Sequence, residues 1–423
     1  MLPKDSFLRS VTILTGGTAL GQIIVIIASP ILTRIYTPED FGLMGVYLSI
    51  LNILSTIASL RYEFAIPLPE REEDASNLFA LCLVITIFTS LLVFFGTLFF
   101  ADQIVSWANT PLLRSYLWLL PVGVALVGTY QVINYWAVRK KAFYWIAQTK
   151  IKQGLGSAVV QIAMGLMNLG ATGLIVGQIL GQALGIEHFY KLINKNDAIS
   201  MRKVNLKGIR EVAVRYQNFP KYSSLSGLLN SFGSQLMPLF LAAFYGPAVA
   251  GWFVISNRVV QLPLMYIGSS ISQVYFSRTV EALHTNPYEL EKLFFDTTRR
   301  LLPGAAGVLI LCGLSPWIFP IFFGASWADA GKYALLLVFY SVPAFIITPL
   351  SNLNTFGFNQ WMLVWDALRV AAVVGSLSLS KFLGWNPSSA VLLFSIVMGI
   401  SYILLYILNV WAIRRCILMK VGK

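Results

Sequence analysis

Apolar residues follow one another along this chain in long runs that are separated by short polar connections. Runs of about twenty apolar residues suffice for a helix to cross a hydrocarbon core of about 30 Å. Such runs lie near 11–33, 41–60, 76–100, 113–138, 151–168, 171–192, 222–245, 248–275, 301–323, 331–353, 361–383 and 388–413. They are continuous and lack the alternation of barrel strands. The pattern therefore predicts an all-α integral membrane protein with twelve transmembrane helices.

Composition supports this class of protein. Of the 423 residues, 57% are hydrophobic and only 12% are charged, whereas an ordinary soluble domain has about 25% charged residues. A water-soluble globule is therefore excluded. The first apolar run is longer than the core of a signal peptide, so we expect it to remain as a spanning helix. The three cysteines lie far apart, which supports neither a disulfide framework nor a metal site.

Basic residues are distributed unevenly over the predicted connections. Lys and Arg number 31 and Asp and Glu 18, but the bases form no dense face of the kind that binds nucleic acid. With a cytoplasmic amino terminus, 25 of the bases fall on the inner side and 4 on the outer side. The positive-inside rule then predicts that both termini are cytoplasmic.

A polar, basic segment near the middle of the chain indicates a division into halves. We predict an amino-terminal six-helix bundle over 1–195, a cytoplasmic linker over 196–221 and a carboxy-terminal six-helix bundle over 222–423. With six helices in each half, both halves start from the same side of the membrane, as in parallel repeats. Such repeats typically enclose a central cavity.

A short internal repeat supports this division. The sequence YTPEDFG at 36–42 is echoed by YGPAVAG at 245–251, an offset of 209 residues. Both copies fall in the predicted outer turn between the first and second helices of a half. Sequence alone gives the match but no reason for it.

No enzymatic motif stands out. The chain has no GxxxxGK[ST] loop, no HExxH, no GxSxG and no aspartate-rich metal cluster. A membrane-embedded polysaccharide polymerase would need a sizeable outer loop with clustered charges, and the outer connections are short. We therefore predict that the chain is not an enzyme and needs no metal, and we keep the polymerase as the less favoured alternative.

Charged residues inside the predicted spans are the first place to look for function, because they are expensive there. Arg258 lies about eleven residues into the run 248–275, or about 16 Å from its outer end at 1.5 Å per residue. Asn257 and Gln261 accompany it, with Gln261 three positions on along the helix. Arg258 could instead be a structural residue paired with a carbonyl or carboxylate. We favour a cavity-lining, ligand-binding role.

Three further arginines and one acid are weaker candidates. Arg369 has Asp366 three residues earlier, a spacing that permits an intrahelical ion pair. If a watery cavity reaches this pair, Asp366 becomes a candidate proton or cation site. Arg34 and Arg61 stand at helix ends, where an interfacial anchor is the simpler interpretation and a place on a cavity rim the alternative.

One stretch of the chain carries a family resemblance. The sequence LTRIYTPEDFGLMGVYLSILNILSTIASLRYEFAIPLPEREEDASNL at 32–78 resembles the opening of bacterial polysaccharide-biosynthesis membrane proteins. These are the lipid-linked oligosaccharide flippases of O-antigen (Wzx type) and capsule pathways. The likeness continues in TGGTALGQ at 15–22 and in the basic and aromatic turn 139–145. It implies the multidrug/oligosaccharidyl-lipid/polysaccharide exporter superfamily, with two six-helix bundles around a cavity that opens to each side in turn.

The resemblance also implies a substrate and its binding residues. The substrate is an oligosaccharide on undecaprenyl pyrophosphate, moved from the cytoplasmic to the periplasmic leaflet of the bacterial inner membrane. By analogy Arg258 binds the pyrophosphate, with Arg34, Arg61 and Arg369 as weaker matches. No cofactor is implied, and coupling to H⁺ or Na⁺ stays open. The expected partners are the bilayer and the polymerase and chain-length regulator of the same pathway.

Two other functions are kept as alternatives. A cation-coupled multidrug or toxin exporter of the same superfamily predicts a net acidic cavity, whereas this chain has more arginine than carboxylate in its spans. A non-transporting assembly subunit can be separated from a transporter only by assay.

Overall fold

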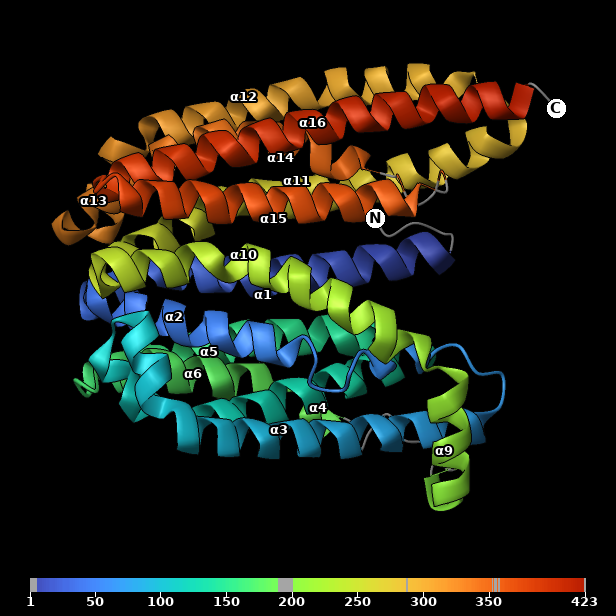
Figure 1. Ribbon diagram of the computed structural model, residues 1–423, viewed down its shortest axis with the longest axis horizontal. Coiled ribbons are helices and arrows are strands. Elements are labelled where there is room, and N and C mark those ends of the chain that lie inside the picture. The colour runs from blue at the N-terminus through green and yellow to red at the C-terminus, as the bar shows by residue number, and fades with distance from the viewer. Residues whose placement is uncertain are drawn as a thin grey trace. The chain divides into compact units, whose positions relative to one another are not determined.

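The computed structural model describes residues 6–188, 201–286, 288–351, 353, 356 and 358–421, and every regular element in these ranges is helical (Figure 1). This confirms the predicted all-α class. The chain divides into two compact units, Met1–Gly251 and Trp252–Lys423. Each unit is described by itself.

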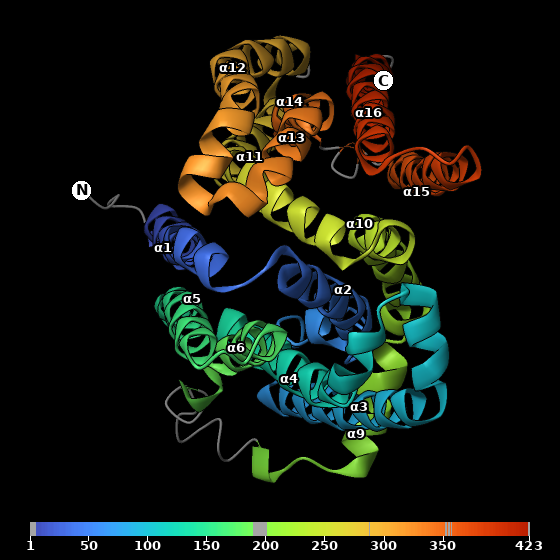
Figure 2. The same cartoon turned by 90° about the vertical axis from the view of Figure 1, so that its left-hand side faces the viewer.

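The first unit is built from eight α-helices within the described ranges. They are α1 (Ser6–Ile35), α2 (Pro38–Ser55), α3 (Glu72–Ala108), α4 (Leu119–Arg139), α5 (Phe143–Leu166), α6 (Ala171–Ala183), α9 (Leu206–Arg215) and α10 (Ser224–Tyr245). Short turns connect them: η1 (Tyr62–Ala65), η2 (Pro111–Tyr116), η3 (Ile186–His188) and the π-helical η4 (Phe219–Ser223). Viewed end on, α1 lies beside α5, and α5 lies beside α6 (Figure 2).

The second unit contains most of one long helix and five further α-helices. The long helix, α11 (Pro247–Thr285), begins in the first unit and continues into the second. It is followed by α12 (Glu289–Phe323), η5 (Ala325–Trp327), α13 (Ala328–Leu336), α14 (Val338–Ile347), η6 (Thr348–Leu350), α15 (Asn359–Phe382) and α16 (Pro387–Val421). Helix α16 packs against α14 and α15.

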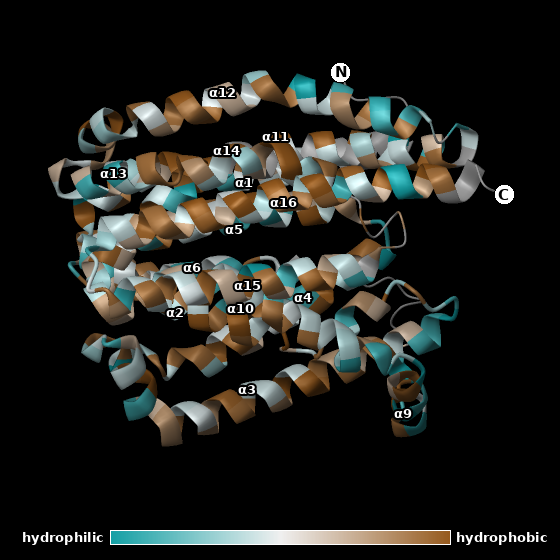
Figure 3. Ribbon diagram, turned by 45° about the horizontal axis from the view of Figure 1, so that its top comes forward, coloured by the Kyte–Doolittle hydropathy of each residue, from teal (hydrophilic) through white to brown (hydrophobic). Residues whose placement is uncertain are grey.

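The helices fall where the apolar runs predicted them. By length and hydropathy, six helices in the described ranges qualify as membrane spans, and a seventh is added if 325–336 and 338–350, bent by 51°, form one span. Apolar residues predominate along the helices, and polar residues are more frequent at the helix ends and on α9 (Figure 3). The count of twelve spans stays a prediction.

Packing assigns α10 to the first unit, because α10 contacts α2. The unit boundary after Gly251 therefore differs from the division at 196–221 that the sequence suggested, and the bundles 1–195 and 222–423 stay a prediction. Of the linker, residues 196–200 lie outside the described residues. The rest contains α9, η4 and the connections around them.

The structure explains the internal repeat. A Cβ atom added to Gly42 of α2 would lie 1.7 Å from the Pro247 carbonyl oxygen, and one added to Gly251 of α11 would lie 1.9 Å from the Pro38 carbonyl oxygen. In each copy of the motif, the glycine leaves room for the first turn of the helix that begins at the other copy. The two helix starts approach backbone to backbone, which only glycine permits.

The two copies begin their helices by different means. Thr37 and Asp40 form a reciprocal capping box at the start of α2, which satisfies backbone N–H groups that have no partner within the helix. In the second copy Gly246 occupies the position of Thr37. Its φ of +93° is a backbone conformation that glycine adopts readily and other residues adopt rarely. Pro38 and Pro247 each occupy the first helical position, where the missing N–H costs nothing.

We expect Gly42→Ala and Gly251→Ala to destabilise the protein, because the atoms in the way are backbone atoms that cannot rotate aside. Overpacking of this kind costs about 1–3 kcal/mol. Thermal unfolding in detergent measures the effect. Gly96→Ala in α3 is the matched control, because a Cβ there meets nothing within 4 Å. Equal melting temperatures for all three variants would contradict the role given to the repeat.

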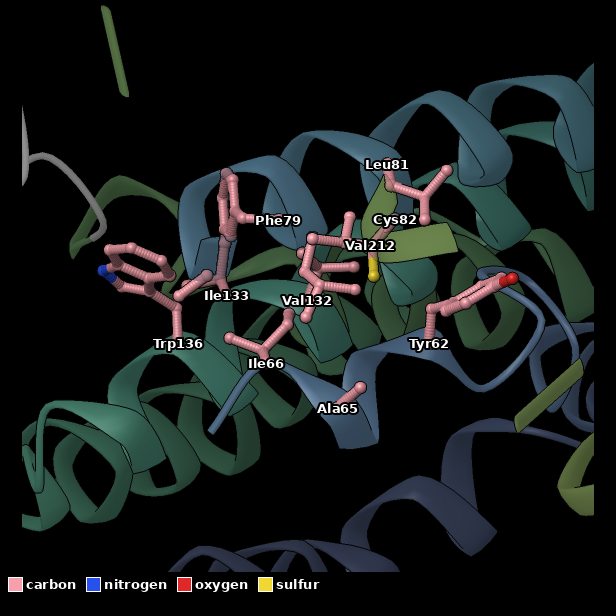
Figure 4. Packing of buried hydrophobic residues seen from close by; sticks show 12 residues of the cluster. Tyr62, Ala65, Ile66, Phe79, Leu81, Cys82, Val132, Ile133, Trp136 and Val212 are labelled. Carbon is pink, nitrogen blue, oxygen red and sulfur yellow. The ribbon is translucent and has the colours of Figure 1, made fainter. Parts of the chain in front are cut away.

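A buried cluster holds the short helix α9 against one end of the first unit. Its side chains come from η1 and the following Ile66, and from α3, α4 and α9, and Val212 of α9 is fully buried among them (Figure 4). The Tyr62 hydroxyl donates to the Ala213 carbonyl oxygen at 2.9 Å, and Arg215 pairs with Asp74 at 2.8 Å. The described part of the polar central segment, which contains α9, therefore packs against the first unit.

Beside this cluster, η1 carries a buried acid outside the spanning helices. Glu63 is only 3% exposed and accepts a hydrogen bond from the Ser59 hydroxyl. Burial raises the pKa of the Glu63 carboxyl above its ordinary value, although the Ser59 hydroxyl, its own backbone N–H and the charge of Arg61 act in the opposite direction.

This shift predicts a pH-dependent stability. Because the folded pKa of Glu63 is raised, the folded state binds a proton more tightly than the unfolded state. The stabilisation is complete below the ordinary Glu pKa of 4.5 and is lost as pH rises through the raised folded value. Melting temperatures across this range should fall with pH in the wild type and should fall less in Glu63→Gln. Identical profiles would contradict this assignment.

Candidate functional site

Arg258 lies on α11, within the second unit, and is partly buried. Its neighbours Ile255 and Val260 are buried, and the Ser256 hydroxyl donates to the Ala330 carbonyl oxygen at 2.5 Å. These contacts fix α11 against α13. Among the residues that the structure describes, Arg258 forms no ion pair. A guanidinium in such a place needs water or an anion beside it, because leaving a charge unsolvated is prohibitive.

The two polar neighbours of Arg258 have different surroundings. Asn257 is partly buried, and its side chain makes no hydrogen bond within the described part of the chain. Gln261 donates from its amide to the hydroxyl of Tyr340, which lies on α14 and is 8% exposed. Gln261 therefore joins α11 to α14, a contact that sequence spacing does not indicate.

Arg369 and Asp366 form the ion pair that their spacing permits. A guanidinium nitrogen of Arg369 lies 2.8 Å from an Asp366 carboxylate oxygen, and the two side chains are 13% and 24% exposed. The guanidinium carbon also lies 4.7 Å from the centre of the Trp365 ring. The charge of Arg369 is thus neutralised within its own helix and stabilised further by an aromatic face.

Aromatic side chains connect this pair to Gln261. The Tyr402 ring of α16 lies 6.0 Å from the Trp365 ring and 5.8 Å from the Tyr340 ring. Arg369 also interacts with the Tyr402 hydroxyl. The second unit therefore brings Gln261 and the Arg369–Asp366 pair into one polar and aromatic network that runs through α11, α14, α15 and α16.

Arg369 reaches the wall of a groove between α15 and α16. The groove has a volume of about 520 Å³ and is lined mostly by apolar residues, among them Trp361, Leu368 and Leu404, together with Ser401. A partly buried ion pair whose arginine lines an apolar groove is better suited to a structural role than to a freely hydrated binding site. The proposed coupling role of Asp366 stays a prediction.

The two arginines from the first unit lie in different settings. Arg34 is in the last turn of α1 and is exposed, as expected for an interfacial anchor. Arg61 is partly buried: its guanidinium carbon lies 5.0 Å from the Phe64 ring centre, and its Nε atom is buried without a hydrogen-bond partner. The same guanidinium packs against Gly227 of α10.

Arg61 also has an unusual backbone. It and Leu60 both have positive φ, 63° and 51°, in the left-handed region that non-glycine residues rarely occupy. Such strain persists only where the surroundings enforce it. The sequence predicts that Arg61 lies at a helix end but gives no sign of this packing.

Lys150 is a charged residue that sequence analysis missed as a candidate. Lys150 precedes the apolar run that begins at 151, which predicts an inner connection at this residue, but α5 already begins at Phe143. The Lys150 ammonium lies 4.8 Å from the centre of the Tyr130 ring and donates to the Gln153 side chain at 3.3 Å. The only available signal was the helical pattern that continues upstream of Lys150.

Solved structures of other proteins share the fold of this chain. The chain matches a structure of the lipid II flippase MurJ in an inward closed conformation with a TM-score of 0.72, at 14% identity, covering 96% of this chain and 90% of that one. It matches an inward-facing multidrug resistance MATE family transporter of the MOP superfamily with a TM-score of 0.69, at 13% identity, covering 93% and 95%. The fold is therefore that of the MOP superfamily, a multi-pass integral membrane fold.

Sequence comparison then gives the family. Residues 31–332 match the model of the family described as polysaccharide biosynthesis protein, so the chain belongs to that family. It is also similar to the succinoglycan biosynthesis transport protein ExoT of Rhizobium meliloti (strain 1021), at 23% identity over 359 residues, or 82% of this chain and 69% of that protein. These matches agree with the prediction of a transporter and not an enzyme.

A double-mutant cycle tests the structural interpretation of the ion pair. Asp366→Asn leaves the Arg369 charge unpaired in a largely buried place, so it should lower stability more than the double variant Asp366→Asn/Arg369→Gln. We expect a coupling free energy of about 1–3 kcal/mol from melting in detergent. Additive effects of the two substitutions would contradict a stabilising pair.

Proposed function

We propose that this protein is a flippase that moves oligosaccharides linked to polyprenyl pyrophosphate from the cytoplasmic to the periplasmic leaflet of the bacterial inner membrane by alternating access. Membership of the polysaccharide biosynthesis protein family and the similarity to a succinoglycan biosynthesis transport protein support the pathway. The similarity to a lipid II flippase supports a lipid-linked substrate. Both termini are proposed to be cytoplasmic, following the distribution of basic residues.

The chemistry of such a substrate defines what the protein must supply. The polyprenyl tail is already soluble in lipid, whereas the sugars and the two phosphates are not. Only the head needs a hydrated path, because an unsolvated anion in hydrocarbon is prohibitively costly. A guanidinium matches this need, since it holds phosphate oxygens with two parallel N–H donors and stays charged at every relevant pH.

Arg258 is the residue we assign to this task, and one observation carries the assignment. Within the described ranges it is a partly buried arginine in a predicted span without an ion pair, whereas Arg369 is neutralised by Asp366. Asn257 adds an amide on the neighbouring position. Arg34, Arg61 and Arg369 stay secondary candidates, and Gln261 is proposed to position α11 through Tyr340.

The driving force needs no nucleotide. Outward movement of an anion follows an inside-negative membrane potential and gains about 2.3 kcal/mol per charge per 100 mV. Coupling to H⁺ or Na⁺ through Asp366 remains part of the proposal as an additional step. The delivered lipid would then serve the polymerase and chain-length regulator of the same pathway.

A cation-coupled multidrug exporter is the second candidate, favoured by the match to an inward-facing multidrug resistance transporter. A cavity for cationic drugs is expected to carry an excess of carboxylates. Among the residues that the structure describes in α5, α11 and α15, two acids, Glu281 and Asp366, stand against six bases, which are Lys150, Lys152, Arg258, Arg278, Arg369 and Lys381. This balance favours an anionic substrate.

Delivery of lipid-linked oligosaccharide in a strain without its own flippase tests the proposal. We expect Arg258→Ala and Arg258→Gln to lower delivery about 10- to 100-fold, the cost of losing a hydrogen-bonded charge pair. Arg258→Lys should retain part of the activity, because it keeps the charge but loses the bidentate geometry.

Arg114→Ala is the control for loss of one positive charge, since Arg114 is exposed and paired with Asp102 at 3.0 Å. All variants are compared at equal protein level in the membrane. Normal delivery by Arg258→Ala would remove Arg258 from the mechanism. Efflux of cationic dyes by the wild type, without oligosaccharide delivery, would favour the exporter instead.

A further inference from the structure

A second groove lies further along α16, towards its carboxy-terminal end, between that helix and the start of α12. It has a volume of about 720 Å³ and is lined by apolar side chains, including Phe295 of α12 and Ile407 and Trp411 of α16, together with Arg414 and Arg415. We refer to it as the α12–α16 groove. Its volume falls in the range of about 300–1,000 Å³ that is usual for small-molecule sites.

The lengths of the helices account for the α12–α16 groove. The bent pair α13 and α14 packs against α12 and α16 but is shorter than either of them. Tyr340 of α14 meets Tyr402 of α16, with ring centres 5.8 Å apart, and α14 ends at Ile347. The carboxy-terminal end of α16 continues past this point, so that α12 and α16 extend beyond α14. The groove lies between these extensions.

The charges at the α12–α16 groove are arranged around one helix end. Arg414 pairs with Glu291 of α12, with nitrogen–oxygen distances of 3.0 and 2.8 Å. The guanidinium carbon of Arg415 lies 5.7 Å from the centre of the Trp411 ring. A cation–π contact uses the face of a guanidinium, and its N–H edge remains able to bind phosphate.

We propose that the α12–α16 groove binds an anionic phospholipid of the bilayer, with the phosphate at Arg414 and Arg415 and an acyl chain along the apolar wall. Two adjacent arginines complement a negative headgroup, and exposed side chains such as Ile407 and Leu418, 57% and 73% exposed, complement an acyl chain. Basic pockets between spanning helices on the cytoplasmic side bind anionic lipid headgroups. The distribution of basic residues assigns this helix end to that side.

The proposal does not depend on the transported molecule, because it concerns a resident lipid. The purified full-length protein is titrated in detergent with phosphatidylglycerol or phosphatidylcholine, and binding is followed by native mass spectrometry and by thermal stabilisation. Phosphatidylglycerol should bind more tightly. The preference should fall about fivefold for each arginine lost and about thirtyfold in the double variant Arg414→Gln/Arg415→Gln.

Two further variants keep the test decisive if the arginine variants fold poorly. Glu291→Gln frees Arg414 from its carboxylate, so phosphatidylglycerol should bind at least about twofold tighter. Val410→Trp fills the groove and should weaken both lipids. Arg114→Gln is the control at an exposed ion pair elsewhere and should change nothing.

Three results would overturn the proposal. One is equal binding of the two phospholipids by the wild type, and another is an unchanged preference in both Glu291→Gln and the double arginine variant. The third is preferential retention of a polyprenyl pyrophosphate in this groove, which would make it part of the transport path instead.

Discussion

A positive charge within an apolar helix must be matched by an acid, an aromatic face, water or a bound anion. The second unit contains two arginines that meet this constraint differently. Arg369 has both Asp366 and Trp365 within its own helix. Arg258 has no carboxylate partner among the described residues, and its helix is fixed from either side by contacts of Ser256 and Gln261. The functional assignment rests on this difference.

The helix that carries Arg258 is also the one that links the two units. Its first turn is held in the first unit by the reciprocal contact of Gly42 with Pro247 and of Gly251 with Pro38. Because these are backbone contacts, they leave little freedom at that end. The remainder of α11 belongs to the second unit, where side-chain contacts to α13 and α14 hold it.

Hydropathy was sufficient to predict the helical class and the approximate position of most helices, because only a continuous apolar run fits a hydrocarbon core. It predicted neither α9, which is polar, nor the break between α13 and α14. It was insufficient for Lys150, since α5 begins at Phe143 and a polar stretch around Lys150 interrupts its apolar residues. The repeat at 36–42 and 245–251 could be recognised in the sequence. Its structural role depends on a contact between residues about two hundred positions apart, which the sequence does not show. Long-range contacts of this kind also escaped prediction at Gln261, which meets Tyr340, and at Arg61, which meets Gly227.

The central claim is that Arg258 binds phosphate, and direct binding tests it most closely. The purified protein is titrated with a short-chain polyprenyl pyrophosphate and with the alcohol of the same chain, in the wild type and in Arg258→Gln. The account predicts that the pyrophosphate binds at least about tenfold more tightly than the alcohol in the wild type, and that this preference is lost in the variant. A pyrophosphate preference that persists undiminished without the arginine would contradict it.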